Sequence, residues 1–404
     1  MRLPASLDLV IVGAGPQALT LAAFLAHKKL RPSRWLAIDP SGAWLEQWRQ
    51  QFARQQIPAL RSPAVHHPDP NPFALRQFAA TRPESLQPPY DRPGTNLFND
   101  FCAERVQHWQ LGDRVYPAQV LHLLPPAAGR GSRFHLQLSD GCELRARRVV
   151  LALGGGRPVW PAWARQVAPG YPPDRLRHEQ QVDLRGLSLA GERVLLVGGG
   201  LSSGHLALGA IARGAQVTLL RRRVIPPKLF DADPSWLGPK ALKAFQAEPD
   251  WSKRYQQLQA ARDGGSLTPS VELQLRRAAR AGLLQWRDRC ELVATSWQAG
   301  QWRGQTTAGE TLTGDHLWLA TGTSLDASRD PLLQPMLAAH PTPLVGGLPV
   351  LDEYLRWPGC ELMLMGGYAA LQLGPVARNL AGARMAGDRL VRALTKPSLA
   401  RVAL

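Results

Sequence analysis

Two copies of one strand–glycine turn–helix–strand unit predict an α/β protein with two Rossmann-like dinucleotide-binding domains. The first copy is DLVIVGAGPQALTLAAFLAHKKL with WLAIDP at 35–40, and the second is ERVLLVGGGLSSGHLALGAIARGAQVTLLRRR at 192–223. In both copies an apolar run of strand length ends in glycines, and a helix of small and apolar residues follows. Linkers near 157–190 and 323–350 indicate that the second domain is inserted into the first. We expect a first domain over 1–165 plus 340–404 and a second over 166–339.

The remaining elements follow from periodicity and from proline and glycine. Residues 57–94 are rich in proline and read as a loop with one short helix at 73–80. We expect helices over 96–110 and most of 240–281. Strands are predicted at 114–124, 133–139, 144–154, 283–297, 315–322 and 361–366, and a closing helix from about 374 to 395.

Composition excludes several classes of protein. Apolar residues make up 45% of the 404 residues, and no run approaches the roughly 20 apolar residues of a membrane span. The chain enters its first strand without a signal peptide, so we expect a cytoplasmic protein. Its 4 cysteines form no C-x-x-C, and no residues have metal-ligand spacing, so neither a redox dithiol nor a metal site is expected. The net charge of +17 is spread along the chain, and we expect no specific nucleic-acid binding, with a basic nucleic-acid binder kept as an alternative.

The first glycine loop predicts a pyrophosphate site. Gly13 permits the tight turn, Gly15 lets the backbone approach the phosphates, and Ala18 allows close packing of helix on strand. The helix N-terminus adds free N–H groups and a positive dipole end. Asp39, about 24 residues after Gly15, ends the second strand, where an acid accepts hydrogen bonds from ribose hydroxyls.

The second loop has Gly198, Gly200 and Ser203, but its second strand ends in arginine where the first ends in Asp39. An acid would repel the 2′-phosphate of NADP, whereas the guanidinium groups of Arg221 and Arg222 pair with it. This contrast predicts NADPH rather than NADH. The alternative is a solvated basic turn.

Three passages carry a resemblance to a known family. DHLWLATG at 315–322 is similar to the D-x-x-x-L-A-T-G passage of the flavin monooxygenases that N-hydroxylate lysine or ornithine, which continue with Tyr where this chain has Thr323. VVLALGGG at 149–156 and GGYAALQLGPVARNLAGAR at 366–384 are similar to their FAD-domain strand and closing helix. The chain departs from the F-x-G-x-x-x-H-x-x-x-F/Y fingerprint around His178, and LRSPAVHHPDPNPFALRQFA lacks the lysine and glutamine pattern of an amino-acid N-hydroxylase.

The resemblance implies FAD in the first domain and NADPH in the inserted one. The helix start near Leu373 and Gly374 would direct its dipole at the flavin pyrimidine ring. The expected FAD contacts are Gly13, Gly15, Pro16, Gln17, Ala18, Asp39, Trp48, Val120, Gly154, Gly366, Leu373 and Gly374. The expected NADP contacts are Gly198, Gly200, Ser202, Ser203, Arg221, Arg222, Thr321 and Gly322.

Cofactors carry the hard chemistry in such proteins, so no catalytic acid or base is demanded. His66 and His67 are candidates for a proton relay or a substrate contact, with loop packing as the alternative. Gln47 is a candidate flavin or nicotinamide contact. Trp44 and Trp48 are expected near the flavin or in plain core. The acids of KLFDADPSW at 228–236 are expected to cap a helix, with a position facing the cleft as the alternative.

The sequence thus predicts an NADPH-dependent FAD monooxygenase of the single-component type that acts on a small molecule. One alternative is a flavin reductase or dehydrogenase that passes electrons to a quinone or a protein. The other is a non-catalytic FAD- and NAD(P)-binding protein.

Overall fold

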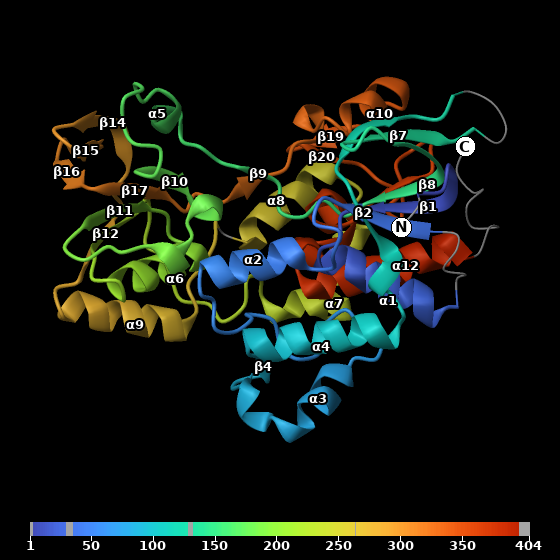
Figure 1. The fold of residues 1–404 in the computed structure, drawn as a ribbon, viewed down its shortest axis with the longest axis horizontal. Coiled ribbons are helices and arrows are strands. Elements are labelled where there is room, and N and C mark those ends of the chain that lie inside the picture. Colours follow the sequence, from blue (N-terminus) through green and yellow to red (C-terminus); the bar gives the residue numbers. More distant parts are fainter. Residues whose placement is uncertain (1–2, 30–34, 128–131, 263, 396–404) are drawn as a thin grey trace.

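The computed structural model describes residues 3–29, 35–127, 132–262 and 264–395, and it contains two sheet domains that lie side by side (Figure 1). The first domain contains both the first and the last of the described residues, and the second contains residues from the middle of the chain. Among the described residues no helix is both long and apolar enough to cross a membrane.

The first domain is built on a mixed seven-stranded sheet, counted over the described residues. Its order is β5 (Val115–Pro117), β2 (Trp35–Asp39), β1 (Ser6–Val12), β8 (Glu143–Leu151), β7 (Phe134–Leu138) and β6 (Val120–Leu124), and β21 (Leu362–Leu364) also pairs with β8. The strands β1, β2, β5, β8 and β21 pair in parallel, and β6 and β7 are antiparallel. The central strands are apolar because helices cover the sheet.

Helix α1 (Pro16–His27) follows β1 directly and packs against the closing helix α12 (Leu380–Thr395). It begins where it does because Gly15 is extended and Pro16 takes the first helical position. Around this sheet lie α2 (Glu46–Arg54), α3 (Ala74–Phe78), α4 (Thr95–His108), α10 (Gln334–Ala339), α11 (Ala370–Leu373) and the short strand pairs β3 (Leu86–Gln87) with β4 (Arg92–Pro93) and β19 (Leu344–Val345) with β20 (Leu348–Pro349).

The second domain is built on a parallel sheet that has five strands in the part of the chain that the structure describes. Its order is β10 (Leu176–His178), β17 (His316–Leu319), β11 (Arg193–Val197), β12 (Gln216–Arg221) and β13 (Leu284–Asp288). Helices α6 (Leu201–Ile211) and α9 (Pro269–Arg280) cover one face. A small antiparallel sheet of β14 (Leu292–Gln298), β15 (Gln301–Thr306) and β16 (Thr311–Gly314) covers the other, together with α5 (Ala162–Arg165). Adjacent side chains of β11 therefore pack on opposite faces of the sheet. Leu196 packs on the side of α6, and Leu195 packs on the side of the buried Trp302 of β15.

Two short antiparallel strands, β9 (Arg157–Pro158) and β18 (Thr323–Ser324), carry the chain into and out of the second domain. Residues just beyond β18, including Leu333 and Met336, are fully buried in the core of the first domain. On the other side, Trp160 and Trp163 pack into the second domain. We propose domain boundaries at these two strands, near 158 and 323, in place of the 166 and 339 expected from the linkers.

Helices α7 (Pro239–Ala247) and α8 (Trp251–Arg262) belong to the inserted sequence but pack against the first domain. Phe245 and Leu258 are buried in its core. Arg254 donates a hydrogen bond to the carbonyl of Leu371 at 3.1 Å. The α8 helix lies between the two sheets (Figure 1), so the inserted segment closes over the boundary between the domains.

Two predicted strands need correction, and three elements were not predicted. The strand predicted over 114–124 is two strands, β5 and β6, which pair at opposite edges of the sheet. The strand predicted over 283–297 divides at Arg289, whose φ is +53°, into β13 and β14 of different sheets. Strands β15 and β16 and helix α2 were not predicted, because their sequences are polar and lack the apolar runs by which the other elements were recognised.

The closing helix begins at Leu380 rather than near 374. Gly374 has φ of +81°, which ends α11, and Pro375 then starts a 3-10 turn over Pro375–Arg378. The predicted helix N-terminus at Leu373 and Gly374 is therefore a helix end, and the next long helix starts six residues farther on.

Candidate functional site

The first glycine loop has the geometry of a pyrophosphate cradle. Gly13 has φ of +104°, and its N–H donates to the carbonyl of Ile38 at 2.8 Å. A Cβ at Gly13 would lie 2.6 Å from the carbonyl oxygen of Ala152, so only glycine fits there. At Gly15 a Cβ would meet nothing within 4 Å. The space beside Gly15, at the start of α1, is therefore open to a phosphate.

Asp39 holds this loop from the end of β2. One carboxylate oxygen accepts a hydrogen bond from the N–H of Ala14 at 3.0 Å. The other accepts hydrogen bonds from the N–H and the hydroxyl of Ser41, at 3.0 and 2.6 Å. The contact of Asp39 with a ribose stays a prediction, and its position next to the loop is compatible with that role.

The second glycine loop repeats this geometry. Gly198 has φ of +147°, its N–H donates to the carbonyl of Leu220 at 3.0 Å, and a Cβ there would lie 2.3 Å from the carbonyl oxygen of Ala320. Gly200, like Gly15, has open space where a Cβ would be. The hydroxyl of Ser203 donates to the carbonyl of Gly200 at 2.7 Å and is buried.

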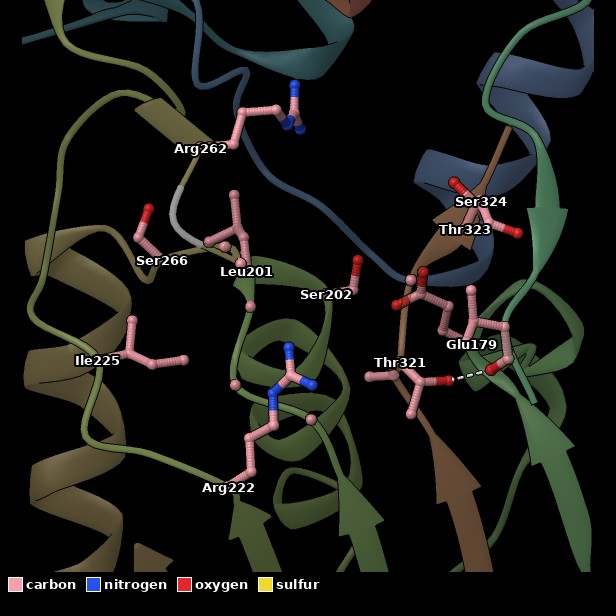
Figure 2. Close-up of a pocket in the computed structure, with 18 of the residues that line it drawn as sticks. Glu179, Leu201, Ser202, Arg222, Ile225, Arg262, Ser266, Thr321, Thr323 and Ser324 are labelled. Carbon is pink, nitrogen blue, oxygen red and sulfur yellow. Dashed lines mark hydrogen bonds between the residues drawn. The ribbon is translucent and has the colours of Figure 1, made fainter. Parts of the chain in front are cut away.

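A cavity of about 1000 Å³ opens between the two domains beside this second loop (Figure 2). Every predicted NADP contact except the buried Ser203 lines it: Gly198, Gly200, Ser202, Arg221, Arg222, Thr321 and Gly322. From the first domain the lining includes Gly155, Gly367 and Pro375, which are immediate sequence neighbours of the predicted FAD contacts Gly154, Gly366 and Gly374. The cavity therefore joins the second loop to the region predicted for the flavin.

The predicted FAD contacts occupy different environments. Gly13, Gly154 and Gly366 follow the C-terminal ends of β1, β8 and β21, which are parallel neighbours, so they lie at one edge of the sheet. Gln17 is buried, and its amide donates to the carbonyl of Ala377 at 3.1 Å while its carbonyl oxygen has no partner among the described residues. The orphan oxygen and the open Gly15 both fit a bound dinucleotide.

Other predicted FAD contacts are placed in packed surroundings. Leu373 is fully buried, and Val120 is a buried residue of β6. Trp48 stacks on Phe52 with ring centroids 3.9 Å apart. The indole N–H of Trp44 donates to the carbonyl of Leu111, which makes it a core residue.

The two predicted phosphate-binding arginines differ in burial and in their contacts. Arg221 is buried, forms an ion pair with Asp288 and lies 4.4 Å over the ring of Trp286. Arg222 is exposed, lines the cavity and forms no hydrogen bond or ion pair with any described residue (Figure 2). Arg222 is therefore the guanidinium that is available to a phosphate.

Sequence reasoning missed an arginine of the proline-rich loop. Arg61 crosses from the first domain and donates hydrogen bonds of 2.6 to 2.8 Å to the hydroxyl of Ser266 and to the carbonyls of Lys228, Leu229 and Phe230. Asp231 lies 3.7 Å from Arg61 and 2.8 Å from Arg262, so one carboxylate joins two arginines. Burial lowers the pKa of Arg61. Nothing in the local sequence pattern marks this contact, because the hydrogen-bond partners are 167 to 205 residues away.

Two further residues of the cavity wall were also missed. Glu179 is buried beside the second loop; burial raises the pKa of its carboxyl group, and a hydrogen bond with Ser202 acts in the opposite direction. Arg378 donates hydrogen bonds to the carbonyl of Gly155 and to the hydroxyl of Thr323, and burial lowers its pKa. A carboxyl group and a guanidinium thus lie on opposite domains of one cleft.

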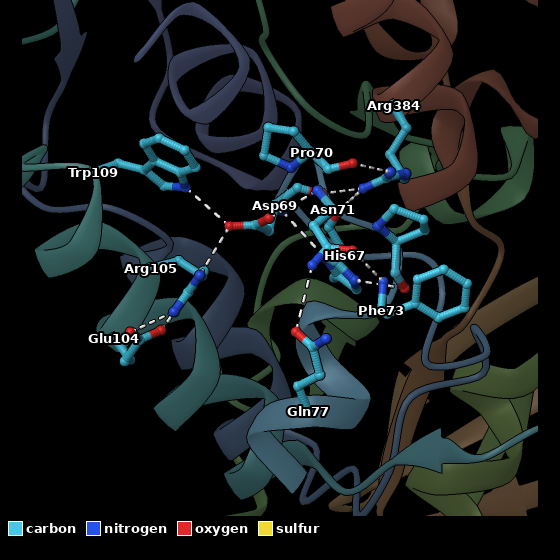
Figure 3. A network of polar contacts seen from close by, with 11 residues as sticks. His67, Asp69, Pro70, Asn71, Phe73, Gln77, Glu104, Arg105, Trp109 and Arg384 are labelled. Carbon is cyan, nitrogen blue, oxygen red and sulfur yellow. Dashed lines mark hydrogen bonds and ion pairs between the residues drawn. The ribbon is translucent and has the colours of Figure 1, made fainter. Parts of the chain in front are cut away.

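His66 and His67 do not line this cavity. His67 is fully buried in a polar network in which Asp69 binds Arg105 and Trp109, and Arg384 binds the backbone of the same loop (Figure 3). Burial lowers the pKa of both histidines to about 4. This placement supports the alternative of loop packing. Gln47 is an exposed residue of α2 that does not line the cavity either.

The acids after the arginines divide between two roles. Asp233 accepts a hydrogen bond from the N–H of Ser235 at 2.8 Å and caps a short 3-10 turn, as expected. Asp231 instead faces the cleft through its two arginines. Within the described ranges no three His, Cys, Asp or Glu side chains are grouped as metal ligands.

Comparisons with known proteins agree with this geometry. The FAD-NAD(P)-binding family matches residues 10–156. A ferredoxin–NADP reductase of Acidovorax sp. (strain JS42) is 28% identical over 211 residues, 52% of this chain and 52% of the reductase. The chain thus spans about half the length of the curated relative it matches.

Solved structures cover nearly the whole chain. An ornithine N-hydroxylase from Kutzneria sp. 744, solved with reduced FAD, NADP+ and L-ornithine, has a TM-score of 0.78 at 18% identity, with 97% of this chain and 100% of that one covered. The ornithine hydroxylase of Pseudomonas aeruginosa has a TM-score of 0.77 at 17% identity, with 96% and 98% covered. A bacillithiol disulfide reductase from Bacillus cereus follows at 0.62 and 16%, with 97% and 99% covered. The chain therefore carries an FAD-NAD(P)-binding domain and has the two-domain fold of the N-hydroxylating flavin monooxygenases.

Proposed function

We propose that this chain is an NADPH-dependent FAD monooxygenase of the single-component type, acting on a small molecule. One observation carries the proposal: the second glycine loop and the flavin-side turns of the first domain open onto the same cavity of about 1000 Å³. A bound FAD would accept a hydride from the nicotinamide and, once reduced, would pass these two electrons to dioxygen from solution. The single chain would hold donor and acceptor in one cleft between the two domains.

The preference for NADPH rests on Arg222. Its guanidinium is exposed to the cavity and has no protein partner among the described residues. Arg221, the residue before it, is buried and is held by Asp288 and by the ring of Trp286. Arg221 would contribute charge and support, and Arg222 would form the direct hydrogen bonds with a 2′-phosphate.

Helices α7 and α8 of the inserted sequence would help to exclude water from the cavity during the reaction. Arg262 lies at the end of α8, and its pairing with Asp231 links that helix to Arg61 of the first domain. Figure 2 shows Arg262 and Arg222 at opposite ends of the cavity. The ion pair of Arg262 with Asp231 is therefore separate from the predicted phosphate contact of Arg222. Excluding water strengthens the polar interactions inside such a site.

The experiment uses the purified protein reconstituted with FAD. NADPH is expected to bleach the flavin absorbance anaerobically, and mixing with dioxygen in a stopped-flow instrument is expected to produce a transient spectrum before oxidised flavin returns. L-ornithine, L-lysine and cadaverine are the first substrates to test, because proteins of this fold are named for acting on them. Direct return to oxidised flavin with every compound would contradict the proposal.

The match to a ferredoxin–NADP reductase favours a second candidate, a reductase that passes electrons to a quinone or a protein. Anaerobic oxidation of NADPH that requires such an acceptor would identify it. If NADPH leaves the bound flavin coloured, the non-catalytic alternative holds instead. The cytoplasmic location stays a prediction of the sequence.

A further inference from the structure

A second cavity, of about 370 Å³, lies between the first domain and the outer side of α6 and α9. Its walls come from the loop around Gln55–Arg61, from the strand pair that contains Arg92, and from residues of the two helices such as His205 and Gln274. No residue predicted to bind FAD or NADP lines it. Its volume falls within the range of small-molecule sites.

Arg92 is the unusual residue of this cavity. Its side chain is only 8% exposed, yet within the described ranges the guanidinium makes a single hydrogen bond, from Nη2 to the carbonyl of Pro88 at 3.2 Å. Its Nε has no partner among the described residues. No carboxylate in the described part of the chain forms an ion pair with it, and the adjacent Asp91 pairs with Arg76 instead. A buried guanidinium without an anionic partner is costly, which makes an absent partner the natural explanation.

His205 presents a second unpaired group to the same cavity. It lies on α6, and its ring forms no hydrogen bond with any residue that the structure describes. Burial lowers its pKa to about 4, so the ring is neutral at neutral pH and offers one donor and one acceptor. The amides of Gln56, Gln87 and Gln274 add polar groups to the wall.

We propose that this cavity binds a small organic or inorganic oxyanion, a carboxylate or a phosphate, whose charged group is held by Arg92 and whose remainder contacts His205 and the glutamine amides. The planar fork of arginine matches both anions bidentately. A cation is excluded by the unpaired guanidinium. A polymeric ligand does not fit a cavity of about 370 Å³.

The cavity shares part of its wall with the nucleotide cleft. Arg61 and Leu201 line both. Gln55, from the second cavity, donates to the backbone carbonyl of Glu179, whose carboxyl group lies in the first. Occupation of the second cavity is therefore expected to alter the affinity of the nucleotide cleft. The existence of the anion site rests on the cavity itself and not on the proposed activity.

Calorimetric titration of the FAD-loaded full chain tests the proposal. The probes are inorganic phosphate and succinate, each at constant ionic strength, with saturating NADP+ present so that the nucleotide cleft is filled. The variant R222A serves as a second control for binding in that cleft, and R147A, at an exposed arginine of β8, controls for general loss of charge. Binding of one probe and not the other tells a phosphate ligand from a carboxylate ligand.

The expected result is saturable binding of at least one probe by the wild type, R222A and R147A, weakened about 10- to 100-fold in R92A. If R92A does not fold, R92Q and H205A provide the same comparison, because each removes one anion-facing group. Binding that R92A or its substitutes retain in full, binding that NADP+ abolishes, or no binding of either probe would overturn the proposal. None of these results depends on turnover.

Discussion

The two glycines of the second loop allow the fold and the nucleotide site to be tested separately. In G198A the new Cβ would lie 2.3 Å from the carbonyl oxygen of Ala320, on a backbone with φ of +147°. The φ strain alone costs on the order of 1–3 kcal/mol, and relieving the overlap requires a backbone shift. We expect a loss of about 3 kcal/mol or more from the free energy of unfolding, a drop in melting temperature of roughly 6–12 °C.

In G200A the result is expected to be reversed. The new Cβ would meet nothing within 4 Å, and the φ of −87° is open to any residue. The free energy of unfolding is expected to change by no more than about 0.5 kcal/mol. The added methyl group enters the space where a phosphate would approach α6, so the Kd for NADPH is expected to rise at least about tenfold.

Thermal unfolding of the cofactor-free proteins and titration of the FAD-loaded proteins with NADPH provide the two readouts. The pair G13A and G15A repeats the comparison for FAD, because the Cβ clash at Gly13 and the open space at Gly15 are the same in kind. The reasoning is refuted if G200A unfolds as early as G198A, or if G200A binds NADPH as well as the wild type.

Three other predictions concern charged groups. R222A is expected to raise the Kd for NADPH about 10- to 100-fold and leave that for NADH unchanged, measured by titration; an equal loss for both would refute a 2′-phosphate contact. The affinity of the wild type for NADPH is expected to decline with rising pH, because burial raises the pKa of Glu179 and its ionisation would place a negative charge beside Ser202. E179Q is expected to remove this decline, and a pH profile of Kd unchanged by the variant would contradict this. The pKa of His67 is about 4 in the folded protein against 6.5 for a free histidine, so as the pH drops the unfolded chain protonates this ring before the folded chain does. The free energy of unfolding therefore falls as the pH drops from 6.5 toward 4, by about 3 kcal/mol at most. Chemical unfolding at pH 7 and 4.5 should show a smaller difference in H67Q, and an equal difference would exclude His67 as a source.

The hydrogen bonds of His67 explain why its neutral form is preferred. Its Nδ1 accepts from the N–H of Asp69 at 3.2 Å, and its Nε2 lies 3.2 Å from the carbonyl of Pro72 (Figure 3). A proton on Nε2 satisfies both contacts. A second proton on Nδ1 would face a donor, and the charge would be buried near Arg384, which lowers the pKa further.

The local sequence was sufficient for the two nucleotide loops. Gly13 and Gly198 are required by a backbone angle and a carbonyl within a few ångströms, and both follow from a parallel strand entering a helix. Apolar runs of strand length predicted β1, β8, β11 and β17, because these strands are covered on their faces by other elements. Such signals are contained in 20 to 30 consecutive residues, so the sequence alone revealed the α/β class and the paired cofactor domains.

Only the tertiary structure separated Arg221 from Arg222, since Arg221 is the last residue of β12 and is held by Asp288 and Trp286, whereas Arg222 lies just beyond the strand and is exposed. It also brought Arg61 to Asp231, placed α8 over the first domain and left Arg92 buried without an anion. These contacts join segments far apart in the chain, and their energy depends on burial and on partners that no local pattern encodes. The cradles were therefore determined by sequence, and the walls and charges of the cleft between them by packing.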